Sequence, residues 1–405
     1  HFEKIIIFFE EERDRYFEGK ETGKQVYILS PAEQTKTLDI LTGSDLFADH
    51  LFPDLEKLGL VGEEVNKEAC YLSVISRLIK KPINICTLST YGTGKSYLHD
   101  TIHKLVPDED LKSYARITKN DLYYREEENA FVGKVLSIDE IEGLGESLYS
   151  IRTLISSGYL AISYTKMNPQ TGKLGSQENK VIGRPSIFCT GTSDENIDEE
   201  TLSRFLLLTT DVSNEQRYRI KQRQFYEMTL SGLKEKREQD KITDKHKNIL
   251  RLIKKIDVVF PSAWDKTLKS LNNGDYSVRD NLCYLSLITS YAVMAQHTRK
   301  IHTATDETGN FQYIETSKRD VERANHIMRE IFGKSIKDLT PPQKHFLCAV
   351  HSYAKNRIKG KNLTISDVTF YEKDLRAFAG MSAWQVNHYL NDLVKLEYII
   401  LDSRG

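Results

Sequence analysis

Short apolar runs alternate with polar segments through the middle of the chain, and this alternation predicts an α/β fold. The apolar runs are strand-sized and lie at 83–88, 134–138, 160–164 and 186–190. Before the first run, at 63–81, apolar residues recur at helical spacing, and Pro82 ends that helix. Strands that alternate with helices favour a mostly parallel sheet, so we predict a core of this kind at 63–225.

The remainder of the chain is predominantly helical in pattern. Beyond Asp211 the strand signals fade, residues 215–255 are helical in composition, and residues 276–300 predict one long helix. After Pro341 come three helical patterns and a short apolar strand at 398–401, an order that favours a winged helix-turn-helix. We therefore expect an N-terminal region of unassigned role at 1–62, a helical lid at 226–338 and a winged-helix domain at 339–405.

The composition is that of a soluble globular protein of two or three domains. The chain has 405 residues, of which 39% are hydrophobic and 28% charged. Its 57 Lys and Arg residues balance 58 Asp and Glu residues, which excludes a generally basic nucleic-acid coat but allows a local positive channel. No apolar stretch of about 18 residues predicts a membrane span. Five scattered cysteines without a CxxC pair predict no zinc site and no disulfide framework, and they favour a cytoplasmic location.

A glycine-containing stretch follows the strand at 83–88 and opens a helix, as a phosphate-binding loop does. Such a loop needs closely approaching backbone amides, hence Gly92 and Gly94, a Lys for the β and γ phosphates, and a hydroxyl for Mg²⁺. Lys95 and Ser96 fit the last two roles. The alternative is a glycine turn that contains Gly-Lys-Ser by chance, which the strand before and the helix after argue against. The expected nucleotide-binding residues are Ser89, in place of the usual first glycine, Thr90, Tyr91, Gly92, Thr93, Gly94, Lys95, Ser96 and Tyr97.

An apolar run about forty residues after this loop ends in two acids, Asp139 and Glu140. Asp139 is placed to hold the magnesium shell together with Ser96, and Glu140 to orient or deprotonate the attacking water. An apolar run ending in Asp-Glu is common and usually only a strand that leaves the core. Its pairing with the phosphate-binding loop favours the catalytic interpretation.

Three further positions are candidates for contacts to the transferring phosphate. The strand at 186–190 has a polar end, where Thr190 or Thr192 is expected to contact the γ phosphate or the water; the alternative is a capped strand end. Arg204 is expected to meet the γ phosphate of a neighbouring subunit, or else to form a surface ion pair. Arg279, at the start of the long helix, is expected to contact the phosphates from the lid, or else to pair with Asp275 or Asp280.

These motifs, in this order and spacing, resemble those of an AAA+ ATPase, and more narrowly the core of minichromosome-maintenance replicative helicases. The resemblance departs from those helicases at Leu206, where they usually carry an Asp after the Phe. It implies ATP and Mg²⁺ as cofactors and an α/β AAA+ P-loop core. The stretches that carry the resemblance are 89–96, 138–140, 203–205 and 277–279.

Residues 58–225 are also similar to the ATPase part of DNA primase-helicases of bacterial mobile elements and prophages. The similarity rests on the run from Gly62 to Lys67, on Tyr71-Leu72 and Ser76-Arg77, and on the run from Pro169 to Leu174. It implies a ring-forming, hexameric, ATP-driven replicative DNA helicase or translocase. A zinc-finger and primase region often precedes the ATPase in that family, so either this chain is the helicase fragment or the primase lies on another chain.

The segment from Ala161 to Val181 predicts a hairpin, with Lys166, Lys173 and Lys180 near its tip and arms. In motors of the minichromosome-maintenance type a hairpin at this point projects into the ring channel and touches DNA, which we expect to be single-stranded. Contact with a phosphate backbone requires positive charge and little else. The alternative is a solvated surface hairpin, because lysines also protect sheet edges.

The helical pattern at 381–390 begins with a Ser N-cap and would be the recognition helix of the winged helix. Gln385, Asn387 and His388 are placed to reach a groove or a phosphate. Such domains also bind protein or only pack. Two rivals to a helicase remain: a DNA-binding initiator or loader that uses ATP as an assembly switch, and an AAA+ remodeller that acts on protein.

Overall fold

The computed structural model describes the chain in two compact units, 1–331 and 332–405. The residues it describes are 27–89, 92–118, 120–125, 127–145, 147–167, 174–191, 198–261, 278–307, 309–334, 341–358, 368–395 and 399. The predicted motifs around Thr90, Tyr91, Lys173 and Thr192 therefore lie outside the described residues, in whole or in part.

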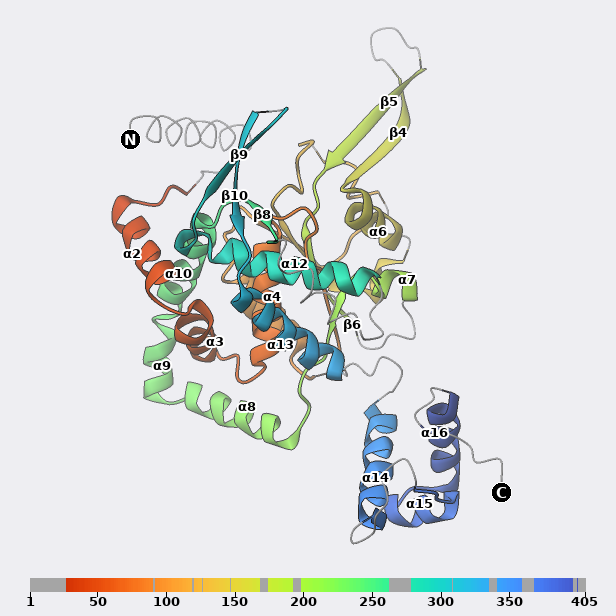
Figure 1. The fold of residues 1–405 in the computed structure, drawn as a ribbon. Coiled ribbons are helices and arrows are strands. Elements are labelled where there is room, and N and C mark those ends of the chain that lie inside the picture. Colours follow the sequence, from red (N-terminus) through yellow and green to blue (C-terminus); the bar gives the residue numbers. More distant parts are fainter. Residues whose placement is uncertain are drawn as a thin grey trace. The chain divides into compact units, whose positions relative to one another are not determined.

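A five-stranded parallel sheet forms the centre of the first unit (Figure 1). Ile85 pairs with Phe188 on one side and with Leu206 on the other, so the first strand along the chain is an inner strand of the sheet. The strands, in spatial order, are β2 (Leu111–Tyr114), β3 (Val135–Glu140), β6 (Ser186–Gly191), β1 (Ile85–Leu88) and β7 (Leu206–Leu208). The predicted α/β fold with a parallel sheet is confirmed, and β2 and β7 are strands that the apolar pattern did not reveal.

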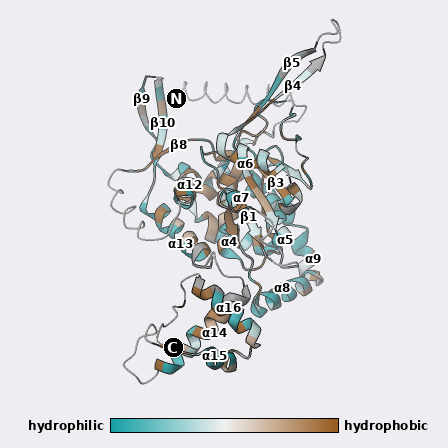
Figure 2. Cartoon of the chain, turned by 90° about the vertical axis from the view of Figure 1, so that its right-hand side faces the viewer, coloured by the Kyte–Doolittle hydropathy of each residue, from teal (hydrophilic) through white to brown (hydrophobic). Residues whose placement is uncertain are grey.

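Helices cover both faces of this sheet: α4 (Glu64–Ser76) and α5 (Lys95–His103) on one, α6 (Ser147–Ser157) on the other. Alternate residues of β6 show the two faces. The hydroxyl groups of Ser73 on α4 and Ser186 lie 2.7 Å apart, and Phe188 packs on α5. Ile187 points the other way, into a core shared with Leu154 of α6. Figure 2 shows hydrophobic residues concentrated around β1 and β3 and hydrophilic residues along α8 and α9.

A long antiparallel hairpin is inserted between α6 and β6. It consists of β4 (Tyr159–Met167) and β5 (Leu174–Ile182), which pair from Tyr159 opposite Ile182 to Met167 opposite Leu174. The hairpin extends away from the central sheet (Figure 1). The predicted hairpin is thus present, and the apolar run at 160–164 belongs to it rather than to the parallel sheet.

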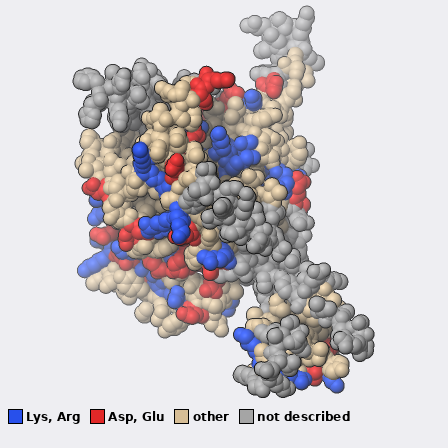
Figure 3. All heavy atoms as spheres, in the orientation of Figure 1, with Lys and Arg blue, Asp and Glu red and all other residues tan. Residues whose placement is uncertain are grey.

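Short helices precede and follow the central sheet within the first unit. Ser30 caps α2 in a capping box with Glu33, and α2 packs against α10. The preceding elements are α2 (Pro31–Gly43), a π-helical segment η1 (Leu46–Leu51) and α3 (Phe52–Lys57); the following ones are α8 (Asn214–Glu227), α9 (Leu230–Lys236) and α10 (Gln239–Leu252). The short helix α7 (Glu199–Leu202) lies between β6 and β7. Figure 3 shows Lys and Arg interspersed with Asp and Glu on one face of this unit, in keeping with the near-zero net charge.

The region predicted as an all-helical lid contains a three-stranded sheet as well as helices. Besides α9 and α10, its described helices include α12 (Val278–Met294), which packs on α4, and α13 (Lys318–Lys334). Its strands are β8 (Asp257–Val259), β9 (His302–Asp306) and β10 (Gly309–Glu315), in the order β8-β10-β9. Most side chains of β9 and β10 are exposed or half-buried on both faces, so these strands carry no apolar alternation by which the sequence could reveal them.

In the second unit the structure describes three helices, α14 (Pro341–Ile358), α15 (Glu372–Ala379) and α16 (Ala383–Lys395). Phe346, Val350, Leu375, Val386 and Leu393 form their common core. The strand predicted at 398–401 lies, apart from Ile399, outside the described residues, so the winged helix stays a prediction. None of the described helices has the length and apolar character needed to cross a membrane.

Candidate nucleotide site

The loop between β1 and α5 leaves the carboxyl edge of the sheet and turns through two glycines with positive φ. Gly92 has φ 72° and Gly94, the N-cap of α5, has φ 90°. A Cβ placed on either would have no heavy atom within 4 Å. Glycine is therefore needed here for its backbone conformation rather than for space. The turn directs the amino end of α5, with its positive dipole, toward the region that a bound phosphate would occupy.

Lys95 closes this loop from the first residue of α5. Its Nζ donates a hydrogen bond of 2.6 Å to the main-chain oxygen of Ser89, across the base of the loop. Ser89 is itself held from both neighbouring strands: its amide donates to the carbonyl of Gly191, and its hydroxyl accepts from Thr210 Oγ1 at 2.9 Å. The serine that replaces the usual first glycine thus ties the loop to the end of the sheet, a role that the loop motif alone does not indicate.

The two acids of β3 emerge from the core at the same edge of the sheet. The first four residues of β3 are buried, whereas Asp139 and Glu140 are exposed. The pairing of β3 with β6 shifts between Ile138 and Glu140, and the Thr190 hydroxyl donates a hydrogen bond to the main-chain oxygen of Asp139. In this structure Thr190 therefore fixes the backbone from which both carboxylates project. Thr192, the other candidate for a phosphate contact, lies outside the described residues.

Asp100, on the second turn of α5, is a charged neighbour of this edge that sequence reasoning missed. Burial, followed by the negative charge of Asp139, raises the pKa of Asp100. Two carboxylates that repel one another beside the loop suit a divalent cation, which the hydroxyl of Ser96 would also help to hold. Among the described residues no three His, Cys, Asp or Glu side chains gather to form a metal site. Mg²⁺ would therefore depend on nucleotide phosphates and water for most of its ligands.

Helix α5 is anchored to the sheet by two buried histidines. His99 Nε2 lies 2.8 Å from Thr87 Oγ1 on β1, and His99 and His103 both meet the ring of Phe188 edge-on. Burial lowers the pKa of His99 to about 3, with a smaller contribution from His103, and lowers that of His103 to about 4. Both rings are therefore neutral near pH 7, and this contact holds the helix that carries Lys95.

The start of α5 also contacts the segment that leads into α4 and the end of α8. The hydroxyl of Tyr97 donates to the carbonyl of Leu58 at 2.9 Å. Burial, and then the negative charge of Glu227 on α8, raises the pKa of Tyr97. Gln216 of α8 donates to the carbonyl of Val61 at 2.7 Å. Residues 58–62 and α8 therefore border the loop on the side of Tyr97.

Hydrogen bonds also join the start of α4 to the residues that follow β7. Glu63 has φ 62° in the left-handed region, and its carboxylate accepts hydrogen bonds from Asn66 Nδ2 and from the amide of Asp211. Asn66 also donates to the carbonyl of Thr209 at 2.9 Å. The start of α4 is thereby fixed beside the residues that follow β7, a relationship between distant segments that the sequence does not indicate.

Residues 31–255 match the model of the MTBMA_p00010 P-loop domain, which is more than half of the chain and includes the entire central sheet. The chain belongs to this family. It is a P-loop NTPase, with the loop at 89–96 at the carboxyl edge of its sheet. No curated protein matches the sequence.

Arg204 of this P-loop NTPase lies at the opposite edge of the sheet from Lys95. It precedes β7, and the side-chain amide of Asn84, which precedes β1, donates to its main-chain oxygen at 3.3 Å. Its guanidinium binds Glu200 Oε1 at 2.7 Å and the hydroxyl of Ser156 at the end of α6. The structure thus brings Lys95 together with the acids of β3 but places Arg204 away from them, in an intramolecular ion pair.

Arg279 lies beside the segment of Arg204 rather than beside the phosphate-binding loop. On the first turn of α12 its guanidinium donates to the hydroxyl of Ser203. The predicted contact of Arg279 with the phosphates stays a prediction. Of the pairing partners considered for Arg279, Asp275 lies outside the described residues.

The lysines of the hairpin lie on both of its arms. Lys180 of β5 pairs with Ala161 of β4 and is exposed, with its ammonium 5.6 Å from the ring centre of Tyr159. Lys166 pairs with Gly175 in the backbone ladder. Lys173 lies outside the described residues. The described arms therefore carry Lys166 and Lys180 together with Glu178, and the base of the hairpin lies next to α6.

Proposed function

We propose that this P-loop NTPase couples ATP hydrolysis to the translocation or unwinding of DNA, as the replicative helicase motor of a mobile genetic element. Its ATP sites would lie between the subunits of a ring, which we propose to be a hexamer. The observation that carries the proposal is the separation of Arg204 from Lys95 across the sheet. Strand β1 has four residues, so the two edges are roughly 13 Å apart along the strand. A guanidinium at Arg204 can serve a γ phosphate only if that phosphate is held by another copy of the chain.

The residues at the carboxyl edge suit phosphoryl transfer to water. Lys95 and the amides at the start of α5 would neutralise the β and γ phosphates, and Ser96 and Asp139 would hold Mg²⁺, which polarises those phosphates when bound. Glu140, at the exposed end of β3, would orient the attacking water and accept its proton. Arg204 of a neighbouring copy would neutralise the charge that develops on the transferring group.

The intramolecular pair of Arg204 with Glu200 does not oppose this assignment. It is an i,i+4 pair in which the side chain of Glu200 is 60% exposed and that of Arg204 is 16% exposed. An exposed pair of this kind stabilises a protein by about 0.3–0.5 kcal/mol. A multiply charged phosphate on a neighbouring copy would compete with Glu200 for the guanidinium. DNA is assigned to the hairpin because Lys166 and Lys180 lie on arms that project from the core.

The test is the ATPase rate with and without single-stranded DNA, on protein sized in the presence of a non-hydrolysable ATP analogue. We expect a ring in the analogue and a rate that rises with DNA. A rate that DNA leaves unchanged would point to a remodeller of protein. DNA stimulation without processive strand separation would point to the initiator or loader that uses ATP for assembly.

A further inference from the structure

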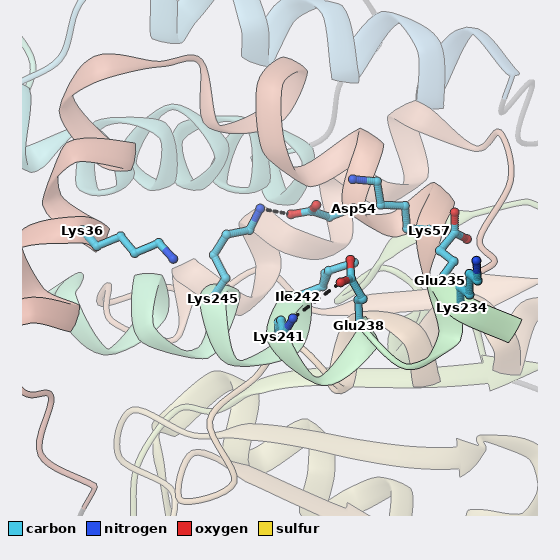
Figure 4. Close-up of a pocket in the computed structure, with 9 residues that line it drawn as sticks. All are labelled: Lys36, Asp54, Lys57, Lys234, Glu235, Glu238, Lys241, Ile242 and Lys245. Carbon is cyan, nitrogen blue, oxygen red and sulfur yellow. Dashed lines mark hydrogen bonds and ion pairs between the residues drawn. The ribbon is translucent and has the colours of Figure 1, made fainter. Parts of the chain in front are cut away.

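A hollow of about 630 Å³, open to solvent, lies between α2, α3, α9 and α10, and none of the expected nucleotide-binding residues is part of its lining (Figure 4). Its most common side chain is lysine. Its lining consists of Lys36, Asp54, Lys57, Lys234, Glu235, Glu238, Lys241, Ile242 and Lys245. This set contains five lysines, three acids and no aromatic side chain.

The floor of the hollow consists of buried polar side chains that hydrogen-bond to one another and whose charges balance. Asp54 is 5% exposed, and its Oδ2 binds the ammonium of Lys245 and lies 3.0 Å from His246 Nε2. On the far side, His246 Nδ1 lies 3.2 Å from the hydroxyl of Tyr71. Burial alone would raise the pKa of Asp54, but the hydrogen bonds from His246 and Lys245 hold it below its usual value. Burial lowers the pKa of His246, so the floor is a neutral imidazole beside a Lys–Asp ion pair.

The two acids of the rim are also engaged. Glu235 binds Arg223, a residue outside the lining, at 2.5 Å. Glu238 lies 3.5 Å from Lys241. Neither carboxylate is therefore left to neutralise the remaining lysines.

Three lysines from three different helices remain around the opening: Lys36 of α2, Lys57 of α3 and Lys234 of α9. All three are exposed, and no described residue forms an ion pair with any of them. Figure 4 shows Lys36 extended toward Lys245 across the hollow, and Lys57 above Asp54. A concave arrangement brings these positive charges closer together than a convex surface would, and its walls focus their field.

We propose that this hollow, hereafter the lysine pocket, binds a compact anion that carries several phosphate groups. Ammonium groups act on phosphate as mobile point charges. The three lysines from three helices that form no described ion pair, with Lys241 and Lys245 beside them, can surround a phosphate-dense ligand. A volume of about 630 Å³ is that of a small-molecule site. The lining offers no aromatic ring on which a base would stack, so the recognised chemistry is phosphate rather than nucleobase. Either a free polyphosphorylated metabolite or the phosphates of a nucleic-acid strand would supply it.

The experiment uses inositol hexakisphosphate as the probe, because it is dense in phosphate and has no base. Its binding to the full chain is measured by calorimetry at low salt. All proteins carry Lys95→Ala, which removes the lysine of the nucleotide loop and makes the result independent of ATP turnover. The test variant adds Lys36→Gln and Lys57→Gln. A matched control adds Lys255→Gln and Lys300→Gln, two exposed lysines outside the pocket.

We expect Lys36→Gln/Lys57→Gln to weaken probe binding by about tenfold or more, and the control pair to change it less than twofold. Equal weakening by both pairs, or no measurable binding to the parent protein, overturns the lysine pocket. Competition with a single-stranded oligonucleotide then identifies which ligand supplies the phosphates. If it displaces the probe, and this displacement depends on Lys36 and Lys57, the strand supplies the phosphates. If it does not displace the probe, the ligand is a free polyphosphorylated anion.

Discussion

The side-chain amide of Asn84 donates to the main-chain oxygen of Arg204, and this contact fixes the arginine at the amino edge of the central sheet. A backbone hydrogen bond supports this placement. The amide of Leu206 donates to the carbonyl of Asn84 at 2.7 Å, where β7 begins beside β1. Lys95 follows the other end of β1. The two cations most suited to a γ phosphate therefore cannot serve the same nucleotide within one chain.

Arg204→Ala should bind ATP normally and lose nearly all turnover. An arginine that neutralises the transferring phosphoryl group is worth roughly 10³ to 10⁵ in rate. The control is Arg152→Ala, because Arg152 of α6 binds the same acid, Glu200, at 3.4 Å and has no assigned role in catalysis. Turnover and ATP affinity are measured separately for both variants.

A mixture of Arg204→Ala with Lys95→Ala tests whether the site lies between copies of the chain. Each variant alone lacks one half of the site, whereas a mixed ring contains interfaces that join an intact loop to an intact arginine. Activity above the sum of the two variants is expected. A fully active Arg204→Ala protein that never oligomerises would rule out the ring.

Lys95→Ala should abolish turnover and weaken ATP binding, whereas Glu140→Gln should retain ATP and fail to hydrolyse it. The ammonium of Lys95 already reaches across the loop to Ser89, so no other described cation of the loop can replace it. Glu140→Gln removes only the proton acceptor at the end of β3. ATP affinity by fluorescence titration and turnover by phosphate release distinguish the two effects. Normal hydrolysis by Lys95→Ala would show that the active site has been assigned to the wrong loop.

The loop and the acidic strand could be predicted from sequence because each is a local pattern. The glycines and Lys95 follow β1 closely, and the acids end β3, so the spacing of these residues is visible without tertiary structure. The Ser89–Thr210 hydrogen bond and the effect of Asp139 on Asp100 join segments far apart in sequence, so no local pattern indicates them.

There are also physical reasons why the sequence did not reveal some of the strands. Strand β2 has no fully buried residue and no apolar run. Strand β7 has only three residues, and its apolar run at 205–208 was not recognised as a strand. Strands β9 and β10 are held mainly by their antiparallel pairing and are largely exposed. The helices predicted beyond Asp211 are present as α8, α9, α10 and α12. Helices α8 and α9 were indicated by composition rather than by a buried apolar face, whereas α12 was indicated by apolar residues at helical spacing.

Neutralising Lys166 and Lys173 on the hairpin should weaken DNA binding and reduce its dependence on salt, while basal ATPase activity survives. Each lost phosphate contact reduces the magnitude of the slope of log K against log salt by roughly 0.7 to 0.9. Lys180 is retained because its ammonium also lies over Tyr159 and contributes to the packing of the hairpin. The slope is measured by anisotropy over a salt series, with Lys255→Gln/Lys300→Gln as the control pair. An unchanged slope would mean that these lysines do not contact DNA and that the hairpin is a solvated surface element.

Acid should destabilise the fold through the buried histidines of α5, and His103→Leu should reduce that sensitivity. Burial lowers the pKa of His103 from 6.5 to about 4, so between these values the unfolded chain binds a proton that the folded chain does not. Stability from this residue is therefore fully present above pH 6.5 and is lost as pH falls toward 4. One such proton changes the free energy of unfolding by about 1.4 kcal/mol per pH unit, or roughly 3 kcal/mol across the interval.

Leucine is a suitable replacement because His103 gains little from being polar. The side chain is 6% exposed, it packs on Phe188, and no described residue hydrogen-bonds its Nε2. Removing a buried unpaired nitrogen should leave stability at pH 7 unchanged or raise it. Urea unfolding at several values between pH 4 and 7 measures the slope for the parent protein and for His103→Leu. His103→Leu should flatten the curve by close to one proton. Equal slopes in the two proteins would mean that other groups cause the acid sensitivity of the fold.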